Sequence, residues 1–140
     1  MGTPLLTKEQ ILAQPDEEYM NEAQLAFFRQ LLTDEREELR ERIDRDFQGL
    51  RDYEMPTDPA DVGSAEEQRQ SQLNMLEREK RLLDKIDHAL DRIARGEYGW
   101  CEESGDPIGL RRLMLRPTAT LSIEAKERQE QLEQIGRAHV

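Results

Sequence analysis

Two long stretches, each almost free of glycine and proline, carry apolar residues at helical spacing and constrain the fold more than any other feature of the chain. In the second stretch, residues 65–95, leucine recurs every seven residues, and isoleucine follows the last two leucines by three. The repeating residues are Leu76, Leu83, Ile86, Leu90 and Ile93. Such a repeat is typical of the a/d seam of a coiled coil. Glu79 interrupts this seam, and Leu73 and Leu82 are expected to widen it.

The first stretch, residues 21–53, has a similar apolar stripe with spacings of mostly four and seven. Its members are Phe28, Leu32, Leu39, Ile43, Phe47 and Leu50. Two narrow stripes joined by a short connection bury each other most economically as an antiparallel pair. The sequence therefore predicts a mainly α-helical fold, with a long antiparallel coiled-coil hairpin over residues 21–95 and its tip at residues 55–65.

The tip segment has the composition of a turn. Pro56 and Pro59 are expected to end the first helix, because proline lacks the amide donor that a helix interior needs. Ser64 is expected to cap the second helix. Asp58 and Asp61 lie between these residues, and taken alone they are more often turn or cap residues than functional ones, since aspartate bonds its own backbone in loops.

Residues 1–20 are expected to form an N-terminal arm or one short helix. Thr7 and Gln10 have the spacing of a capping box, which favours a helix. A partly ordered arm is the alternative. If the arm is ordered, its apolar residues need a surface, and the compact end formed by residues 96–140 is the expected one.

The composition changes abruptly after the hairpin. Residues 96–109 contain four glycines and one proline, which predicts tight turns and short strands in a small globular region over residues 96–121. Ser122 is expected to cap a C-terminal helix in the final segment, residues 122–140. The expected core of this end consists of Tyr98, Trp100, Ile108, Leu113, Leu115, Leu121 and Ile123.

Charge and composition exclude several classes of protein. The net charge of −11 argues against direct binding of DNA or RNA, which needs a basic face to displace counterions. No apolar run approaches the roughly 18 residues that a membrane span needs, and the single cysteine cannot form an internal disulfide. The chain is therefore expected to be cytoplasmic. It contains no nucleophile and base, phosphate loop or metal constellation, so an enzyme is not expected.

Cys101 begins a pattern that has the spacing of a four-cysteine zinc ribbon without its ligands. Cys101 and Ser104 form the first pair, and Ser122 and Ala125 form the second pair after seventeen intervening residues. Structural zinc needs four thiolate or imidazole donors, and hydroxyls or a methyl group cannot replace them. We therefore expect a degenerate finger that binds no metal, in which Cys101 is a structural remnant of the ligand set or a minor buried thiol.

Several motifs occur together in this chain. They are Asp58-Pro-Ala-Asp61 at the tip, Gly96-x-Tyr-Gly-Trp-Cys101, Glu102-x2-Gly-x-Pro-Ile-Gly109, Arg111-Arg-Leu113 and Arg116-Pro-Thr-Ala-Thr-Leu121. In this combination the chain resembles the DksA/TraR family of bacterial RNA polymerase regulators. The resemblance implies a monomer that binds the β′ subunit at the rim of the secondary channel, places its acidic tip near the active site and acts with ppGpp in the stringent response.

The resemblance also assigns roles to single residues. Asp58 and Asp61 match the acidic tip residues that the family needs for activity, and Gly63 stands where alanine is usual. The residues that match the ppGpp and polymerase interface are Lys85, Arg116 and Lys126, with Leu82 as an apolar neighbour and Arg78 near the rim. The replaced zinc ligands resemble those of zinc-independent members, which can serve in place of a zinc-containing paralogue when zinc is scarce.

Two other functions fit the same pattern. An acidic hairpin could chelate a second magnesium ion in the polymerase and stimulate transcript cleavage, as Gre-like factors do. A purely structural coiled coil that pairs with other chains is the second alternative, although a dimerising rod does not need the chain reversal at residues 55–65. We therefore expect a non-enzymatic regulator of transcription initiation, with ppGpp as co-regulator and no stably bound cofactor.

Overall fold

The computed structural model describes residues 5–138, which are mainly helical and form two compact units. The hairpin unit is Thr33–Asp87, and the terminal unit consists of the described parts of Met1–Leu32 and His88–Val140. Helices α2 (Glu22–Arg51) and α3 (Pro59–Arg95) contribute to both units. Within the described part of the chain, no helix is long and apolar enough to cross a membrane.

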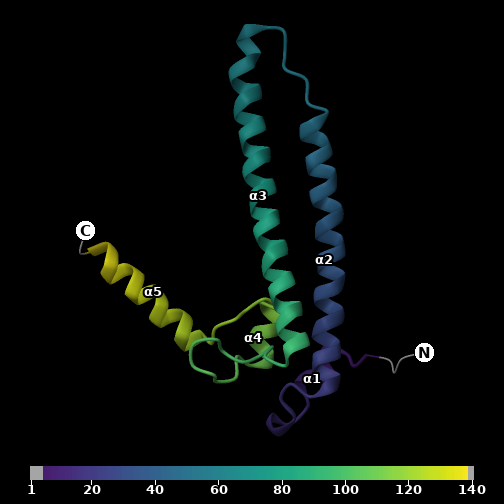
Figure 1. Ribbon diagram of the computed structural model, residues 1–140, viewed down its shortest axis with the longest axis vertical. Coiled ribbons are helices and arrows are strands. Elements are labelled where there is room, and N and C mark those ends of the chain that lie inside the picture. The colour runs from purple at the N-terminus through teal and green to yellow at the C-terminus, as the bar shows by residue number, and fades with distance from the viewer. Residues whose placement is uncertain (1–4, 139–140) are drawn as a thin grey trace. The chain divides into compact units, whose positions relative to one another are not determined.

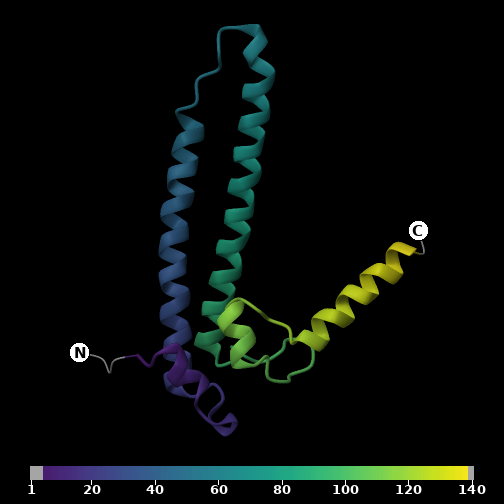
Figure 2. The ribbon, with the colours of Figure 1, turned by 180° about the vertical axis from the view of Figure 1, so that it is seen from behind.

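In the hairpin unit, α2 and α3 lie side by side and run in opposite directions (Figure 1, Figure 2). Leu39 of α2 and Leu76 and Ile86 of α3 are buried between them. An ion pair also joins the two helices, with Arg36 Nε donating to Asp87 Oδ1 at 2.5 Å. The predicted pair of long antiparallel helices is confirmed.

The seam between the helices is narrower than predicted. Leu73 and Leu82 were expected to widen it, but their side chains are 37% and 43% exposed. A contact between only two helices covers one side of each, so residues beside the a/d positions remain in solvent. Glu79 does lie in the seam and is only 8% exposed.

Helix α3 begins earlier than predicted. Pro59 is its first residue rather than a terminator of α2, which already ends at Arg51. Proline suits the first helical position because its missing amide would have no partner there. Asp58 precedes the helix, and its Oδ1 accepts a hydrogen bond from the Ala60 amide at 3.0 Å. The expectation that Ser64 caps this helix is wrong, because Ser64 lies inside it.

The two helices of the hairpin extend unequally toward the tip. Glu79 faces Asp46, yet α2 continues only five residues past Asp46, whereas α3 begins twenty residues before Glu79. The difference of about fifteen residues corresponds to roughly 22 Å of helix. The connection, residues 52–58, joins Arg51 to Pro59 in eight Cα steps and can span at most roughly 29 Å. It rises in steps beside the first turns of α3, with a turn at residue 52 and bends at residues 57 and 58 (Figure 1).

In the terminal unit, the first turns of α2 pack against the last turns of α3. Phe28, Leu32 and Ile93 are buried there, and Tyr98 adds an aromatic ring 5.5 Å from that of Phe28. Four short elements complete the unit. They are α1 (Lys8–Leu12), the 3₁₀ helix η1 (Asp16–Glu18), α4 (Leu110–Leu115) and α5 (Ile123–Ala138).

The N-terminal arm contains one short α-helix, α1, as the capping-box spacing favoured. The capping box is present, since the Gln10 amide donates to Thr7 Oγ1 at 3.1 Å and the Thr7 amide donates to Gln10 Oε1 at 2.8 Å. Ile11 is fully buried, and α1 packs against α4. The compact end therefore supplies the surface that the apolar residues of the arm need.

The short strands predicted after the hairpin are wrong. The described residues contain no strand, and the glycine-rich segment has a single bridge, between Trp100 and Pro107. The chain turns too often for a strand, because Gly99, Gly105 and Gly109 have φ angles of +90°, +77° and +102°. Helix α4 follows directly and was not predicted.

The core of the terminal unit differs in part from the predicted one. Tyr98, Ile108 and Leu113 are buried as expected. Leu115 and Ile123 are 81% and 51% exposed, so placing them in the core was wrong. Trp100, also predicted to be buried, is 36% exposed. The interior is completed instead by the replaced ligand positions of the finger, described below.

Candidate functional site

The two tip aspartates lie together at the start of α3. Asp58 caps the helix, and its carbonyl oxygen accepts a hydrogen bond from the Asp61 amide at 3.0 Å. Both side chains are exposed. Gly63 is exposed inside the first turns of α3, and a Cβ added there would meet nothing within 4 Å. The tip thus presents two carboxylates at a helix N-terminus, where the helix dipole stabilises negative charge.

Three of the predicted interface residues share one face of α3. Arg78, Leu82 and Lys85 are separated by four and three residues, which places them on one side of a helix. Arg78 and Lys85 are exposed, and Leu82 is 43% exposed. This face therefore offers two cations beside an apolar side chain.

The other two predicted interface residues belong to the terminal unit. Arg116 directly follows α4, and Lys126 lies in the first turn of α5, where its amide donates to the Ser122 carbonyl at 2.9 Å. Both side chains are exposed. Convergence of these residues with Lys85 involves both units and stays a prediction.

The degenerate finger keeps the turns of a zinc ribbon. Cys101 Sγ accepts a hydrogen bond from the Ser104 amide at 3.5 Å, and Ser122 Oγ accepts one from the Ala125 amide at 3.2 Å. Both bonds join residue i to residue i+3. Cys101, Ser122 and Ala125 are buried. The second turn also caps α5, as predicted for Ser122.

Hydrogen bonds make the thiol of Cys101 unusually acidic. Burial alone would raise its pKa, but the Ser104 hydroxyl and the amides of Ser122, Ser104 and Glu103 outweigh this effect and lower the pKa of Cys101 to about 6. This acidity could not be predicted from the sequence, because three of the donors are backbone amides. The contact from the Ser122 amide also brings the two turns of the finger together.

The residues at the four ligand positions do not fit zinc. Only Cys101 carries a strong donor, Ser104 and Ser122 offer hydroxyls, and Ala125 offers none. Elsewhere in the described chain, no three histidine, cysteine, aspartate or glutamate side chains are grouped as metal ligands. His88 is engaged with Glu102, with 2.8 Å between Nε2 and Oε1.

Two structural residues of the terminal unit were missed in the sequence. Arg92, in the last turn of α3, donates to the carbonyls of Glu97 and Trp100 at 2.8 Å and to Glu102 Oε1 at 2.9 Å. It is 9% exposed. A buried arginine at a helix end that holds a following loop has no recognisable spacing, so the sequence carries no signal for it.

Tyr19 is the second such residue. Its hydroxyl donates to the Gly99 carbonyl at 2.5 Å and accepts from the Gly109 amide at 2.9 Å, while its ring meets Trp100 edge-on at 5.2 Å. A side chain at Gly99 would collide with Met20, since its Cβ would lie 2.6 Å from the sulfur. The arm and the glycine-rich segment are therefore closely fitted.

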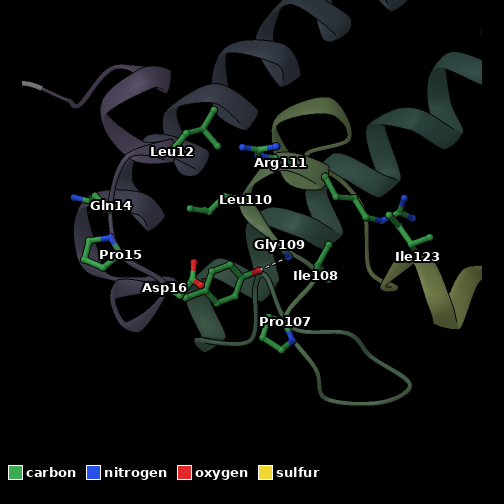
Figure 3. Close-up of a pocket in the computed structure, with 12 residues that line it drawn as sticks. Leu12, Gln14, Pro15, Asp16, Pro107, Ile108, Gly109, Leu110, Arg111 and Ile123 are labelled. Carbon is green, nitrogen blue, oxygen red and sulfur yellow. Dashed lines mark hydrogen bonds between the residues drawn. The ribbon is translucent and has the colours of Figure 1, made fainter.

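A cavity of roughly 620 Å³ lies between the arm and α4 (Figure 3). Its walls include Leu12, Pro15, Ile108 and Leu110, with Arg111 at one side. Among the described residues, no buried polar atom without a partner points into it. Its geometry alone does not define a ligand.

Comparison with known proteins places these features in a family. Residues 24–93 match the family model described as DnaK suppressor protein DksA, N-terminal domain, and residues 96–131 match the prokaryotic dksA/traR C4-type zinc finger. The RNA polymerase-binding transcription factor DksA of Caulobacter vibrioides is 43% identical over 137 residues, covering 97% of this chain and 96% of the relative.

Two further comparisons point to the same family. The RNA polymerase-binding transcription factor DksA of Escherichia coli K12 is 42% identical over 113 residues, covering 80% of this chain and 75% of the relative. The structure of transcription factor DksA2 from Pseudomonas aeruginosa has a TM-score of 0.83 at 65% identity and covers 91% of this chain and 99% of that one.

The fold defines a class of protein with a long helical hairpin and a small finger-like end. Within that class, the chain belongs to the DksA family. The relatives are named as transcription factors and not as enzymes, in agreement with the prediction that this chain is not an enzyme. The zinc-finger model matches the chain even though three of its four ligand positions lack cysteine.

Proposed function

We propose that this chain binds RNA polymerase in the bacterial cytoplasm and regulates transcription initiation, with its acidic tip in the secondary channel. The names of its relatives support polymerase as the partner. The exposed pair Asp58 and Asp61 at the start of α3 is the structural observation that carries the proposal. At short range, a carboxylate interacts with a catalytic magnesium ion, or with the basic residues around it, by several kcal/mol.

Transcription from a ribosomal RNA promoter by purified polymerase tests the proposal. The unmodified chain is expected to repress, and Asp61→Asn is expected to lose most of the repression, because it removes the charge and keeps the shape. Glu66→Gln is the matched control, since Glu66 is also an exposed acid near the start of α3. Equal repression by all three proteins would contradict a role for the tip.

The basic interface residues support ppGpp as a co-regulator. Lys85, Arg116 and Lys126 are exposed cations, and such groups bind phosphates well when they converge. Repression is expected to deepen with ppGpp, and Lys126→Ala is expected to lose only that increment. Lys80→Ala, which alters another exposed lysine of α3, should retain it.

Zinc independence is part of the same proposal. The donor set at Cys101, Ser104, Ser122 and Ala125 supports it, because the residues cannot complete a tetrahedral site. Such a protein can serve in place of a zinc-containing relative when zinc is scarce. Repression should therefore survive a zinc chelator that inactivates a four-cysteine relative assayed alongside.

A Gre-like cleavage factor remains the second candidate, supported by the same acidic tip. A backtracked polymerase complex with labelled RNA separates the two functions. The proposed regulator should release no short RNA, whereas a cleavage factor should release it within the assay. Light scattering addresses the remaining alternative, a structural coiled coil, for which a mass near twice 16.4 kDa is expected instead of a monomer.

A further inference from the structure

An acidic pair, in which Glu79 is buried and Asp46 is half-buried, interrupts the seam of the hairpin unit. Glu79 of α3 is 8% exposed, and its carboxyl group lies close enough to that of Asp46 of α2 to share a hydrogen bond if one of them is protonated. Asp46 Oδ2 and Glu79 Oε2 are shielded from solvent, and neither has a hydrogen-bond donor among the described residues. Two carboxyl groups can share a hydrogen bond only if one of them is protonated. Without that proton, two poorly hydrated charges would face each other across the seam.

The positive charges around the pair do not cancel the repulsion between the two carboxylates. Asp46 and Arg42 face Glu79 from α2, and Arg78 adjoins it on α3. Both arginines lower the pKa of Glu79, but burial, the hydrogen bond with Asp46 and repulsion by Asp46 raise it more. Arg42 and Arg78 are exposed, so solvent weakens their attraction. The folded hairpin therefore retains a proton at a pH at which the unfolded chain has released it.

The seam on the tip side of the pair is weak. Gln72 of α3 has a buried Oε1 without a hydrogen-bond donor in the described chain. Leu76 is buried there, but Leu50 of α2 is only half-buried. On the other side of the pair, Leu39 and Ile86 are both buried. Repulsion at the pair would therefore loosen the tip side of the hairpin first.

We propose that the Asp46–Glu79 pair is a pH-sensitive latch. One shared proton holds α2 and α3 together at low pH, and loss of this proton as the pH rises loosens the tip side of the hairpin. The only bond made or broken is the carboxyl O–H, and solvent supplies or accepts the proton. Because the pKa of Glu79 is raised in the folded state, the contribution is complete below about 4.5, the ordinary value, and is lost as the pH rises through the raised value. The hairpin should be held more tightly at pH 5 than at pH 8.

Urea unfolding of the full chain between pH 5 and pH 8 tests the latch against Glu79→Gln, which keeps the shape and removes the charge. The unfolding equilibrium constant of the parent, divided by that of the variant, should rise about tenfold for each unit by which the pKa is raised. Asp46→Asn, measured in the same way, should also abolish the pH dependence. A ratio that stays constant across this pH range in both comparisons would overturn the proposal.

Glu77→Gln is the matched control, because Glu77 is an exposed acid on the same helix. Its ratio to the parent should not change with pH, and a change equal to that of Glu79→Gln would reduce the effect to general charge repulsion and overturn the latch. Hydrogen exchange provides a local measurement. After correction for intrinsic rates, residues 72–80 of the parent should exchange faster at pH 8 than at pH 5, and those of Glu79→Gln should not.

Discussion

Residues at the start of α3 serve the helix and the proposed function together. Asp58 caps the helix and Asp61 lies in its first turn, where negative charge is favourable by about 0.3–1 kcal/mol. The charges that polymerase would meet therefore also stabilise the tip. Gly63 instead lowers the stability of the helix, because glycine inside a helix costs about 1 kcal/mol relative to alanine.

Replacing Gly63 by alanine should stabilise the protein by up to about 1 kcal/mol. The added Cβ meets nothing within 4 Å, so the gain in helix propensity is not offset by a clash. Urea midpoints measure the effect, and Gly49→Ala is the matched comparison because Gly49 is an equally open glycine inside α2. A lower midpoint for Gly63→Ala would show that the start of α3 does not favour a regular helix.

Cys101 should make the stability of the protein depend on pH. Its pKa is lowered to about 6 in the folded state, so the thiolate is favoured by folding, and this contribution is present above the unfolded pKa and lost as the pH falls toward 6. The stability difference between the parent and Cys101→Ser should grow between pH 6 and pH 8.5 by at most about 1.4 kcal/mol per pH unit. Chemical denaturation of both proteins across this range provides the measurement. No change in the difference would mean that the thiol stays protonated.

At the scale of elements, the connection between α2 and α3 must span the unequal ends of the two helices. Its seven residues, 52–58, must reach past an overhang of roughly 22 Å. Deleting residues 54–56 leaves five Cα steps between Arg51 and Pro59, with a maximum reach of roughly 18 Å. We expect the first turn of α3 to unwind in response, which hydrogen exchange at residues 60–64 would report as a loss of protection. Inserting two glycines at the same place should leave that protection unchanged. If the deletion variant is protected as well as the parent, the length of the connection does not limit the start of α3.

The elements differ in how far the sequence could predict them. The seam of α2 and α3 was predictable because Leu39, Leu76 and Ile86 follow a repeat that only a helix pair satisfies. The start of α3 was missed because Pro59 can end one helix or begin the next, and the local sequence does not decide between them. Tyr19 contacts residues about eighty positions away, and no local pattern encodes such a contact.

At the scale of the whole molecule, contacts from distant parts of the chain hold the terminal unit together. Tyr19 from the arm binds the glycine-rich segment at Gly99 and Gly109, and Arg92 from α3 holds its first turns. Ala125 and Cys101 fill the interior where ligands would converge. Small domains that rely on zinc lose their fold without it, whereas we propose that the buried side chains and hydrogen bonds of this unit hold it without a metal. The melting temperature of the parent should therefore be the same with and without a chelator.

Restoring the ligands should convert this end into a metal-dependent one. The amide of Ser122 contacts the Cys101 thiol, so the two turns already face each other. A variant with Ser104→Cys, Ser122→Cys and Ala125→Cys should bind one zinc ion per chain, measurable by metal analysis, and should melt at a lower temperature once zinc is removed. Ser104→Cys alone is the control and should bind none stably. Failure of the triple variant to bind zinc would mean that the two turns face each other without the tetrahedral geometry of a ribbon, and that this end has diverged in backbone as well as in ligands.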